Sequence, residues 1–118
     1  MSKKIVRTIT IIKPLNIKAE KCSSLYSIQK GFMFYSKRNA KAKLFILPIE
    51  LPAGIHLLFV FFPIIVLWLN QNKKVTACSL ARPFFFYNIH KAKYVLEIPY
   101  TLKTKKFLYL KNKQLKWR

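Results

Sequence analysis

The chain has 118 residues, of which 53% are hydrophobic and 15% aromatic, and it carries a formal net charge of +20. A chain of this length forms one domain that can bury roughly two thirds of its unfolded surface, and its apolar content excludes wholesale disorder. The charge is unusual, because 23 Lys and Arg residues stand against only three acidic ones. A compact protein with this imbalance repels itself unless a partner supplies negative charge, which favours nucleic acid or an anionic membrane as the partner.

The first predicted element is a strand over Lys4–Ile12, because the segment is rich in β-branched residues and Pro14 ends it. The N-terminal residues lack an apolar run followed by a small-residue cleavage site, so we predict no secretory signal and a cytoplasmic protein. A helix is predicted over residues 19–30, where apolar residues recur at helical spacing. Gly31 then stands where a left-handed cap is expected.

A basic loop, Lys37–Lys43, comes next in the chain, and a short strand is predicted at Leu44–Leu47. Pro48 and Pro52 bound this strand, because proline cannot donate a hydrogen bond to a sheet. The interval from residue 44 to 72 has no Lys or Arg, whereas eleven basic residues precede it and twelve follow it.

The apolar stretch Ile55–Leu69 within this interval could be a membrane span or the core of a globular domain. It has fifteen residues, whereas a spanning helix needs about 20. Pro63 also interrupts it, and both flanks are strongly basic, so they give no orientation signal. We therefore predict two core strands, Ile55–Phe61 and Ile64–Leu69, and no transmembrane segment.

The second half of the chain also indicates strands. Residues 70–72 predict a turn, after which residues 74–80 return as the hairpin partner of the preceding strand. A strand is predicted over residues 94–98 and ends at a proline. Residues 107–110 and 114–117 indicate a terminal hairpin. The chain is thus predicted to be one domain over residues 1–118, with basic N- and C-terminal segments.

Short motifs follow one another in a specific order: Gly31-Phe32-Met33-Phe34, Ile55-His56, Phe62-Pro63-Ile64, Val66, Leu69, Ala81-Arg82-Pro83, Ala92 to Pro99, and Leu115-Lys116-Trp117. This series, over about residues 5 to 117, resembles the archaeal branch of domain-of-unknown-function family 192. The resemblance implies a mainly β protein, a compact antiparallel β-barrel or sandwich with one short helix at about residues 19–30, and it implies no activity.

The chain departs from that family where the family tends to carry acids, which are replaced by the following residues: Ile65, Asn70 and Lys111-Asn112. Tyr100 also stands where a glycine is expected. We interpret these changes as a fold whose surface has become suited to an anionic partner. They put in doubt any metal or small-molecule site built on the family's acids.

The sequence gives little support to catalysis. Paired-carboxylate chemistry would need two of Glu20, Glu50 and Glu97 to meet, and no spacing indicates that they do. The groups available for a nucleophile and its base are Cys22, Cys78, His56 and His90, and no sequence context supports pairing them. We predict no enzyme, no metal and no cofactor. The two cysteines are expected as buried or half-buried thiols, and a disulfide between them stays open.

Binding of a polyanion has more support, because Lys and Arg cluster in five segments that are expected to be exposed. The candidate phosphate-binding residues are Lys3, Lys4, Arg7, Lys37, Arg38, Lys41, Lys43, Lys73, Lys74, Lys91, Lys93, Lys103, Lys105, Lys106, Lys111, Lys113, Lys116 and Arg118. Tyr35, Tyr87, Tyr100 and Trp117 could stack on unpaired bases or belong to the core.

No helix-turn-helix, zinc-finger or RNA-recognition signature occurs in the sequence, and a small basic protein without a base-reading motif fits structured RNA bound through its backbone. The leading prediction is a non-catalytic, ribosomal or ribosome-associated protein whose partners are ribosomal RNA and neighbouring ribosomal proteins. The alternatives are a DNA- or chromatin-associated basic protein, a peripheral membrane protein, and a soluble family member with an unknown small-molecule or enzymatic role.

Overall fold

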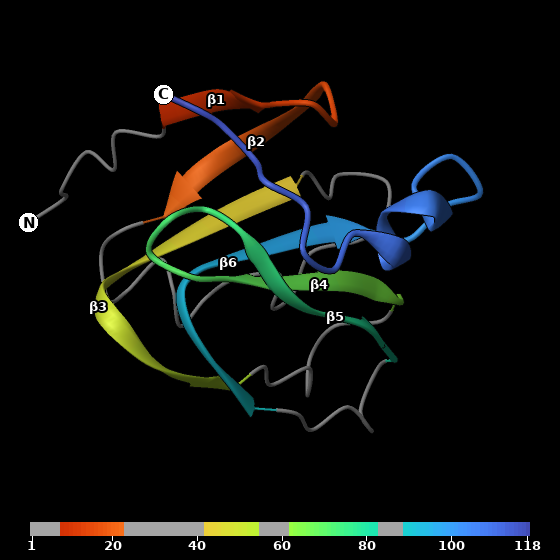
Figure 1. The fold of residues 1–118 in the computed structure, drawn as a ribbon. Coiled ribbons are helices and arrows are strands. Elements are labelled where there is room, and N and C mark those ends of the chain that lie inside the picture. The colour runs from red at the N-terminus through yellow and green to blue at the C-terminus, as the bar shows by residue number, and fades with distance from the viewer. Residues whose placement is uncertain (1–7, 23–41, 55–61, 83–88) are drawn as a thin grey trace, which may run out of the picture.

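The computed structural model describes residues 8–22, 42–54, 62–82 and 89–118 (Figure 1). The elements are β1 (Thr8–Ile12), β2 (Ile17–Cys22), β3 (Ala42–Gly54), β4 (Ile64–Leu69), β5 (Val75–Ala81), β6 (Ile89–Pro99) and a 3-10 helix, η2 (Lys105–Tyr109). The described strands form a six-stranded sheet in the order β1-β2-β3-β6-β4-β5. The prediction of a mainly β fold is confirmed, although β2 and β3 pair in parallel rather than antiparallel.

The first hairpin places a strand where the sequence predicted a helix. β1 confirms the predicted strand over residues 8–12. The chain then reverses at Asn16, which has φ 57° and whose N–H donates to the Ile12 carbonyl at 2.8 Å, a left-handed conformation that asparagine tolerates. Residues 19–22 therefore belong to β2, between β1 and β3, and the helix prediction is wrong for them because sheet pairing on both sides outweighs local spacing. Residues 23–30 lie outside the described residues.

Strand β3 is much longer than predicted and passes through both prolines that were expected to bound it. Its pairing with β6 shifts register between Ile46 and Leu51, so residues 47–50 form a bulge. A bulge removes Pro48 from the ladder, where its missing N–H would be costly. The Lys93 ammonium on β6 donates to the carbonyls of Leu47 and Pro48 and so satisfies two acceptors that the bulge leaves unpaired.

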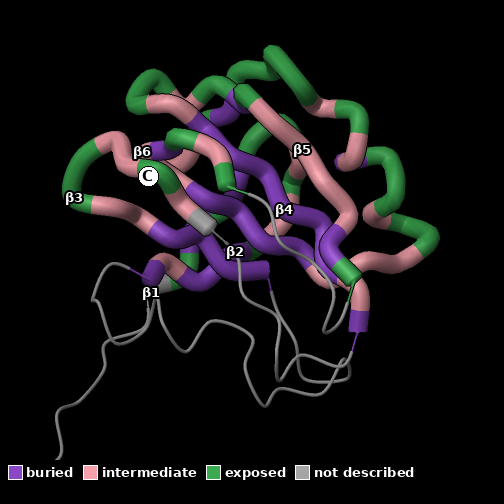
Figure 2. Tube along the Cα trace, turned by 90° about the horizontal axis from the view of Figure 1, so that it is seen from below, coloured by how far each residue is buried: buried purple, intermediate pink, exposed green. Residues whose placement is uncertain are grey.

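The apolar centre of the sequence supplies the core. β4 confirms the predicted strand over residues 64–69, and all six of its residues are buried (Figure 2). Trp68 is fully buried, and its indole N–H donates to the Ala53 carbonyl at 3.0 Å. The companion strand predicted at residues 55–61 lies outside the described residues. Within the described ranges, no helix is long and apolar enough to cross a membrane.

Alternate residues of the strands build two clusters of buried side chains. The first cluster contains Cys22, Phe45, Phe62, Ile64, Val66, Trp68, Ala81, Ala92 and Val95. The second contains Ile12, Ala19, Ala42, Leu44, Ile65, Leu67, Leu69, Val75, Leu96, Ile98, Phe107 and Leu115. Because side chains of a strand point alternately to opposite faces, the even and odd positions of β4 enter different clusters.

The hairpin of β4 and β5 agrees with the predicted turn. The Asn70 side-chain oxygen accepts hydrogen bonds from the backbone N–H groups of Asn72, at 2.9 Å, and Lys74, at 3.1 Å. Lys73 has φ 65°, so the chain reverses within the turn. The asparagine thus replaces backbone partners that the turn residues lack, which is why this residue type favours turns.

The predicted terminal hairpin is wrong. Residues 105–109 form η2, and Gln114 and Lys116 form bridges with Lys74 and Lys13 instead of with residues 107–110. Phe107 and Leu115 are buried in the second cluster, so the segment covers that face of the sheet. The chain then runs across the sheet from η2 toward β1, where it ends (Figure 1). Burial of apolar side chains on the open face therefore decides the path of this segment.

Candidate nucleic-acid interface

The C-terminal residues are bonded to opposite edges of the sheet. Near β1, the Lys13 N–H donates to the Lys116 carbonyl at 2.8 Å, and the Lys116 N–H donates to the Lys13 carbonyl at 2.9 Å. Near β5, the Leu115 N–H donates to the Lys73 carbonyl at 3.0 Å, and the Val75 N–H donates to the Lys113 carbonyl at 2.9 Å. The segment therefore links the two edge strands, which lie at opposite ends of the sheet order.

These bonds bring basic residues from three separate parts of the chain together along the C-terminal segment. We call this set the basic strip: Lys13, Lys73, Lys74, Lys113, Lys116 and Arg118. All members are exposed except Lys73, which is half-buried. Lys13 and Lys116 stand directly opposite each other in an antiparallel bridge, an arrangement in which like charges are destabilising. An anionic partner would remove that cost.

Lys73 is held in place by an aromatic neighbour. Its ammonium lies 4.6 Å from the centroid of the Trp117 ring and donates to the Trp117 carbonyl at 3.3 Å. The Trp117 ring in turn packs edge-on against Tyr94, with 4.9 Å between the ring centroids. Trp117, which the sequence offered as a stacking residue or a core residue, is half-buried and serves to position a cation.

The strip continues toward η2 in the chain. This continuation consists of four exposed lysines: Lys103, Lys105, Lys106 and Lys111. At the other end, the carbonyl of Arg118 accepts a hydrogen bond from the Thr10 hydroxyl at 3.1 Å. Exposed cations therefore follow the C-terminal segment from η2 to β1.

Other predicted phosphate-binding residues lie elsewhere. Lys91 is exposed on β6, opposite Pro52 and away from the strip. Lys93 is half-buried on the same strand and donates to the carbonyls of the β3 bulge. The remaining candidates lie outside the described residues: Lys3, Lys4, Arg7, Lys37, Arg38 and Lys41.

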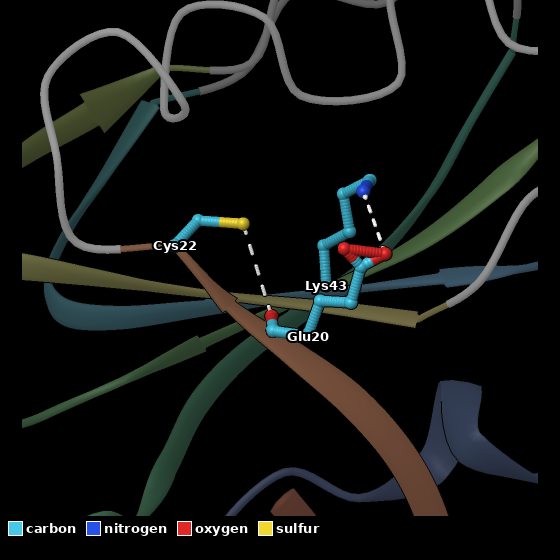
Figure 3. A network of polar contacts seen from close by, with 3 residues as sticks. All are labelled: Glu20, Cys22 and Lys43. Carbon is cyan, nitrogen blue, oxygen red and sulfur yellow. Dashed lines mark hydrogen bonds and ion pairs between the residues drawn. The ribbon is translucent and has the colours of Figure 1, made fainter. Parts of the chain in front are cut away.

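Lys43 is not part of an exposed basic loop, contrary to the prediction. It lies in β3 with 5% of its surface exposed, opposite Glu20 of β2 on one side and Glu97 of β6 on the other. Its ammonium is 3.5 Å from a carboxylate oxygen of Glu20 (Figure 3). A buried lysine that pairs with the Glu20 carboxylate cannot contact a phosphate at the surface, so Lys43 does not belong to the candidate site.

Two of the three glutamates lie on either side of Lys43, and no contact joins their carboxyl groups among the described residues. Glu20 and Glu97 are 8% and 6% exposed and flank Lys43 in one row across three strands. Burial raises the pKa of Glu97 from 4.5 to about 8, and the positive charge of Lys43 acts in the opposite direction. Glu97 therefore keeps its proton to a higher pH than a solvent-exposed glutamate does. This buried row is a feature of the core, and its charges are shielded from solvent.

The residues considered for catalysis or for a metal are dispersed in the described part of the chain. Cys22 is buried and Cys78 is half-buried, and no disulfide joins them. Burial raises the pKa of the Cys78 thiol, which makes it less nucleophilic. The His90 ring packs on Trp68 with 4.5 Å between ring centroids. His56 lies outside the described residues. No group of three His, Cys or acidic residues that could hold a metal occurs among the described ones.

Sequence reasoning missed one member of the strip and its geometry. Lys13 was not among the predicted phosphate-binding residues, although it stands opposite Lys116 in the folded chain. Nothing in the sequence signals this neighbour, because the two residues are more than a hundred positions apart. The Thr10–Arg118 hydrogen bond arises from the same long-range contact.

Two solved structures show the same fold at low sequence identity. A protein from Sinorhizobium meliloti 1021, named as a proposed transcription regulator, matches with a TM-score of 0.79, 12% identity and 98% coverage of both chains. A protein of unknown function from Novosphingobium aromaticivorans DSM 12444 matches with a TM-score of 0.73 and 14% identity, over 94% of this chain and 85% of that one. No protein-family model and no curated protein matches the sequence. The resemblance to domain-of-unknown-function family 192 stays a prediction.

Proposed function

We propose that this protein binds RNA through the basic strip, by contacts to phosphates, and that it catalyses no reaction on that RNA. The observation that carries the proposal is the bridge that places Lys13 directly opposite Lys116. The backbone bonds of the C-terminal segment fix this line of like charges, and a polyanion would neutralise it. Each phosphate contact releases counterions, so the affinity would fall steeply with salt.

Ribosomal RNA is the RNA that we expect, with neighbouring ribosomal proteins as further partners. A net charge of +20 on 118 residues, without a base-reading motif, fits backbone recognition of a structured RNA. Such a protein should co-sediment with ribosomal subunits from its own cells through a wash at moderate salt. Recovery only in the free pool at low salt would contradict the ribosomal assignment, while leaving RNA binding itself open to the test below.

Duplex DNA is the competing partner, since one structural neighbour is named as a proposed transcription regulator. That likeness, at 12% identity, concerns the fold alone. Fluorescence anisotropy with an RNA hairpin and a DNA duplex of equal charge, each titrated at 50 to 200 mM salt, separates the two. We expect the RNA to bind more tightly, and a clear preference for the DNA would replace the proposal with the second candidate.

The strip itself is tested by matched double variants. Lys113→Ala with Lys116→Ala removes two charges from the strip, and Arg82→Ala with Lys91→Ala removes two exposed charges elsewhere. Both variants carry the same net charge, so only position differs. With a single-stranded RNA, the slope of log affinity against log salt should fall by roughly 1.4 if both strip lysines contact phosphates, at about 0.7 per contact. The control should keep the wild-type slope, and an equal fall in both variants would overturn the assignment of the strip.

A further inference from the structure

Tyr109 is an exposed aromatic residue among the lysines of the C-terminal segment. It is 78% exposed at the last position of η2. Two exposed lysines of the helix precede it, Lys105 and Lys106, and Lys111 follows it closely. An aromatic ring that is open to solvent, in a segment with exposed cations, is a combination with which proteins hold single-stranded nucleic acid.

The neighbours of Tyr109 fix its position. Phe107, two residues earlier, is buried in the second cluster, and Leu108 and Leu110 pack against that cluster. The Leu110 carbonyl accepts a hydrogen bond from the Lys113 N–H at 2.9 Å. The Asn112 N–H donates to the carbonyl of Val75 in β5 at 2.7 Å. The backbone on both sides of Tyr109 is therefore anchored, and its ring stays on the surface.

The turn before η2 is held just as firmly. The Thr101 N–H donates to the Thr104 hydroxyl at 2.8 Å, and the Thr104 N–H donates to the Thr101 hydroxyl at 3.1 Å. The Thr104 hydroxyl also donates to the Pro99 carbonyl at 2.9 Å, which ties the turn to the end of β6. Binding to a surface that is already ordered costs less conformational entropy.

We propose that Tyr109 is a stacking platform for an unpaired nucleobase, with neighbouring lysines on the adjoining phosphates. The RNA at this point is then single-stranded, as in a loop or bulge. This inference rests on the proposed function, because it assigns the kind of RNA that the same surface takes. In an A-form duplex the base faces are enclosed in the stack and the phosphates alone are accessible, whereas an unpaired base offers its face to a ring.

The test compares a fluorescein-labelled 12-nucleotide oligouridylate with a 12-base-pair RNA duplex, at 150 mM salt, by fluorescence anisotropy. Tyr109→Ala should weaken binding of the oligouridylate at least about fivefold, as expected for one stacked base, and leave duplex affinity within twofold. Tyr109→Phe keeps the ring and should keep the affinity. Leu102→Ala, at a position 88% exposed in the preceding turn, is the matched control and should match wild type. Thermal unfolding verifies that each variant folds.

Three outcomes would overturn the stacking role: an unchanged affinity of Tyr109→Ala for the oligouridylate, equal losses on single strand and duplex, or a loss in Tyr109→Phe as large as that in Tyr109→Ala. In each of these cases the protein still binds RNA, so the proposed function survives. If wild type binds neither RNA, then the proposed function and the inference that rests on it both fall.

Discussion

Replacing Glu97 by glutamine tests whether the core holds this carboxyl in its protonated form. Glu97 is 6% exposed in β6 and stands opposite Lys43 in the buried row. Burial is the larger influence on its pKa, which rises from 4.5 to about 8. A glutamine has nearly the same shape as the protonated acid. The variant Glu97→Gln should therefore fold as wild type does and lack only the group that titrates at this position.

The sign and size of the effect follow from the two pKa values. Since the folded protein holds the proton more tightly than the unfolded chain, the stability due to Glu97 is complete below pH 4.5 and is lost as pH rises toward 8. At about 1.4 kcal/mol per pH unit, the whole interval corresponds to roughly 5 kcal/mol. From pH 5 to pH 8, the free energy of unfolding of Glu97→Gln should therefore rise by roughly 4 kcal/mol relative to that of wild type.

Urea unfolding followed by tryptophan fluorescence measures this difference, because Trp68 is fully buried in the folded state. The free energy of unfolding is determined for both proteins at pH 5, 6, 7 and 8. Glu50→Gln makes the same chemical change outside the buried row and is the matched control for the substitution. A difference between Glu97→Gln and wild type that stays constant over this pH range would refute the reasoning.

Two further predictions concern the same core and the adjoining turn. Lys43→Met removes the ammonium that lies 3.5 Å from a carboxylate oxygen of Glu20. Because breaking a buried ion pair is strongly destabilising, the free energy of unfolding should fall by about 3 kcal/mol at pH 7. A fall below about 1 kcal/mol in urea unfolding would argue against that pair. Asn70→Ala removes the acceptor of two turn N–H groups and should cost about 1 kcal/mol in the same assay, whereas Asn72→Ala, whose side chain is exposed, serves as its control and should stay near wild type.

Local chemistry predicted much of the sheet. β-branched residues marked β1 and β4, and the asparagines after residue 69 marked the turn into β5. The prediction failed at β2 and at the prolines of β3, where distant strands decide the conformation. β2 is held between two partners, and β3 absorbs Pro48 in a bulge that Lys93 supports. No window of the sequence contains these partners.

The sequence predicted that lysines form the candidate interface, but it did not predict which lysines are exposed or which lie next to each other. The surplus of lysine indicated a polyanion partner, yet it could not distinguish Lys43, which is buried, from Lys116, which is exposed. That difference depends on register, because Lys43 falls between two glutamates on neighbouring strands. The strip likewise depends on the C-terminal segment meeting Lys13 at the far edge of the sheet.

Lysine footprinting measures where the RNA lies. The protein is acetylated with a short pulse of an amine-reactive ester, with and without saturating RNA, and the rate at each lysine is read by mass spectrometry. RNA on the basic strip should slow modification of Lys13, Lys74, Lys113 and Lys116 several-fold, and Lys91 should react as before. Two results would contradict the proposal that the strip is the RNA-binding surface. In the first, RNA slows acetylation of Lys91 and leaves the strip lysines unaffected; in the second, RNA slows acetylation of all exposed lysines equally.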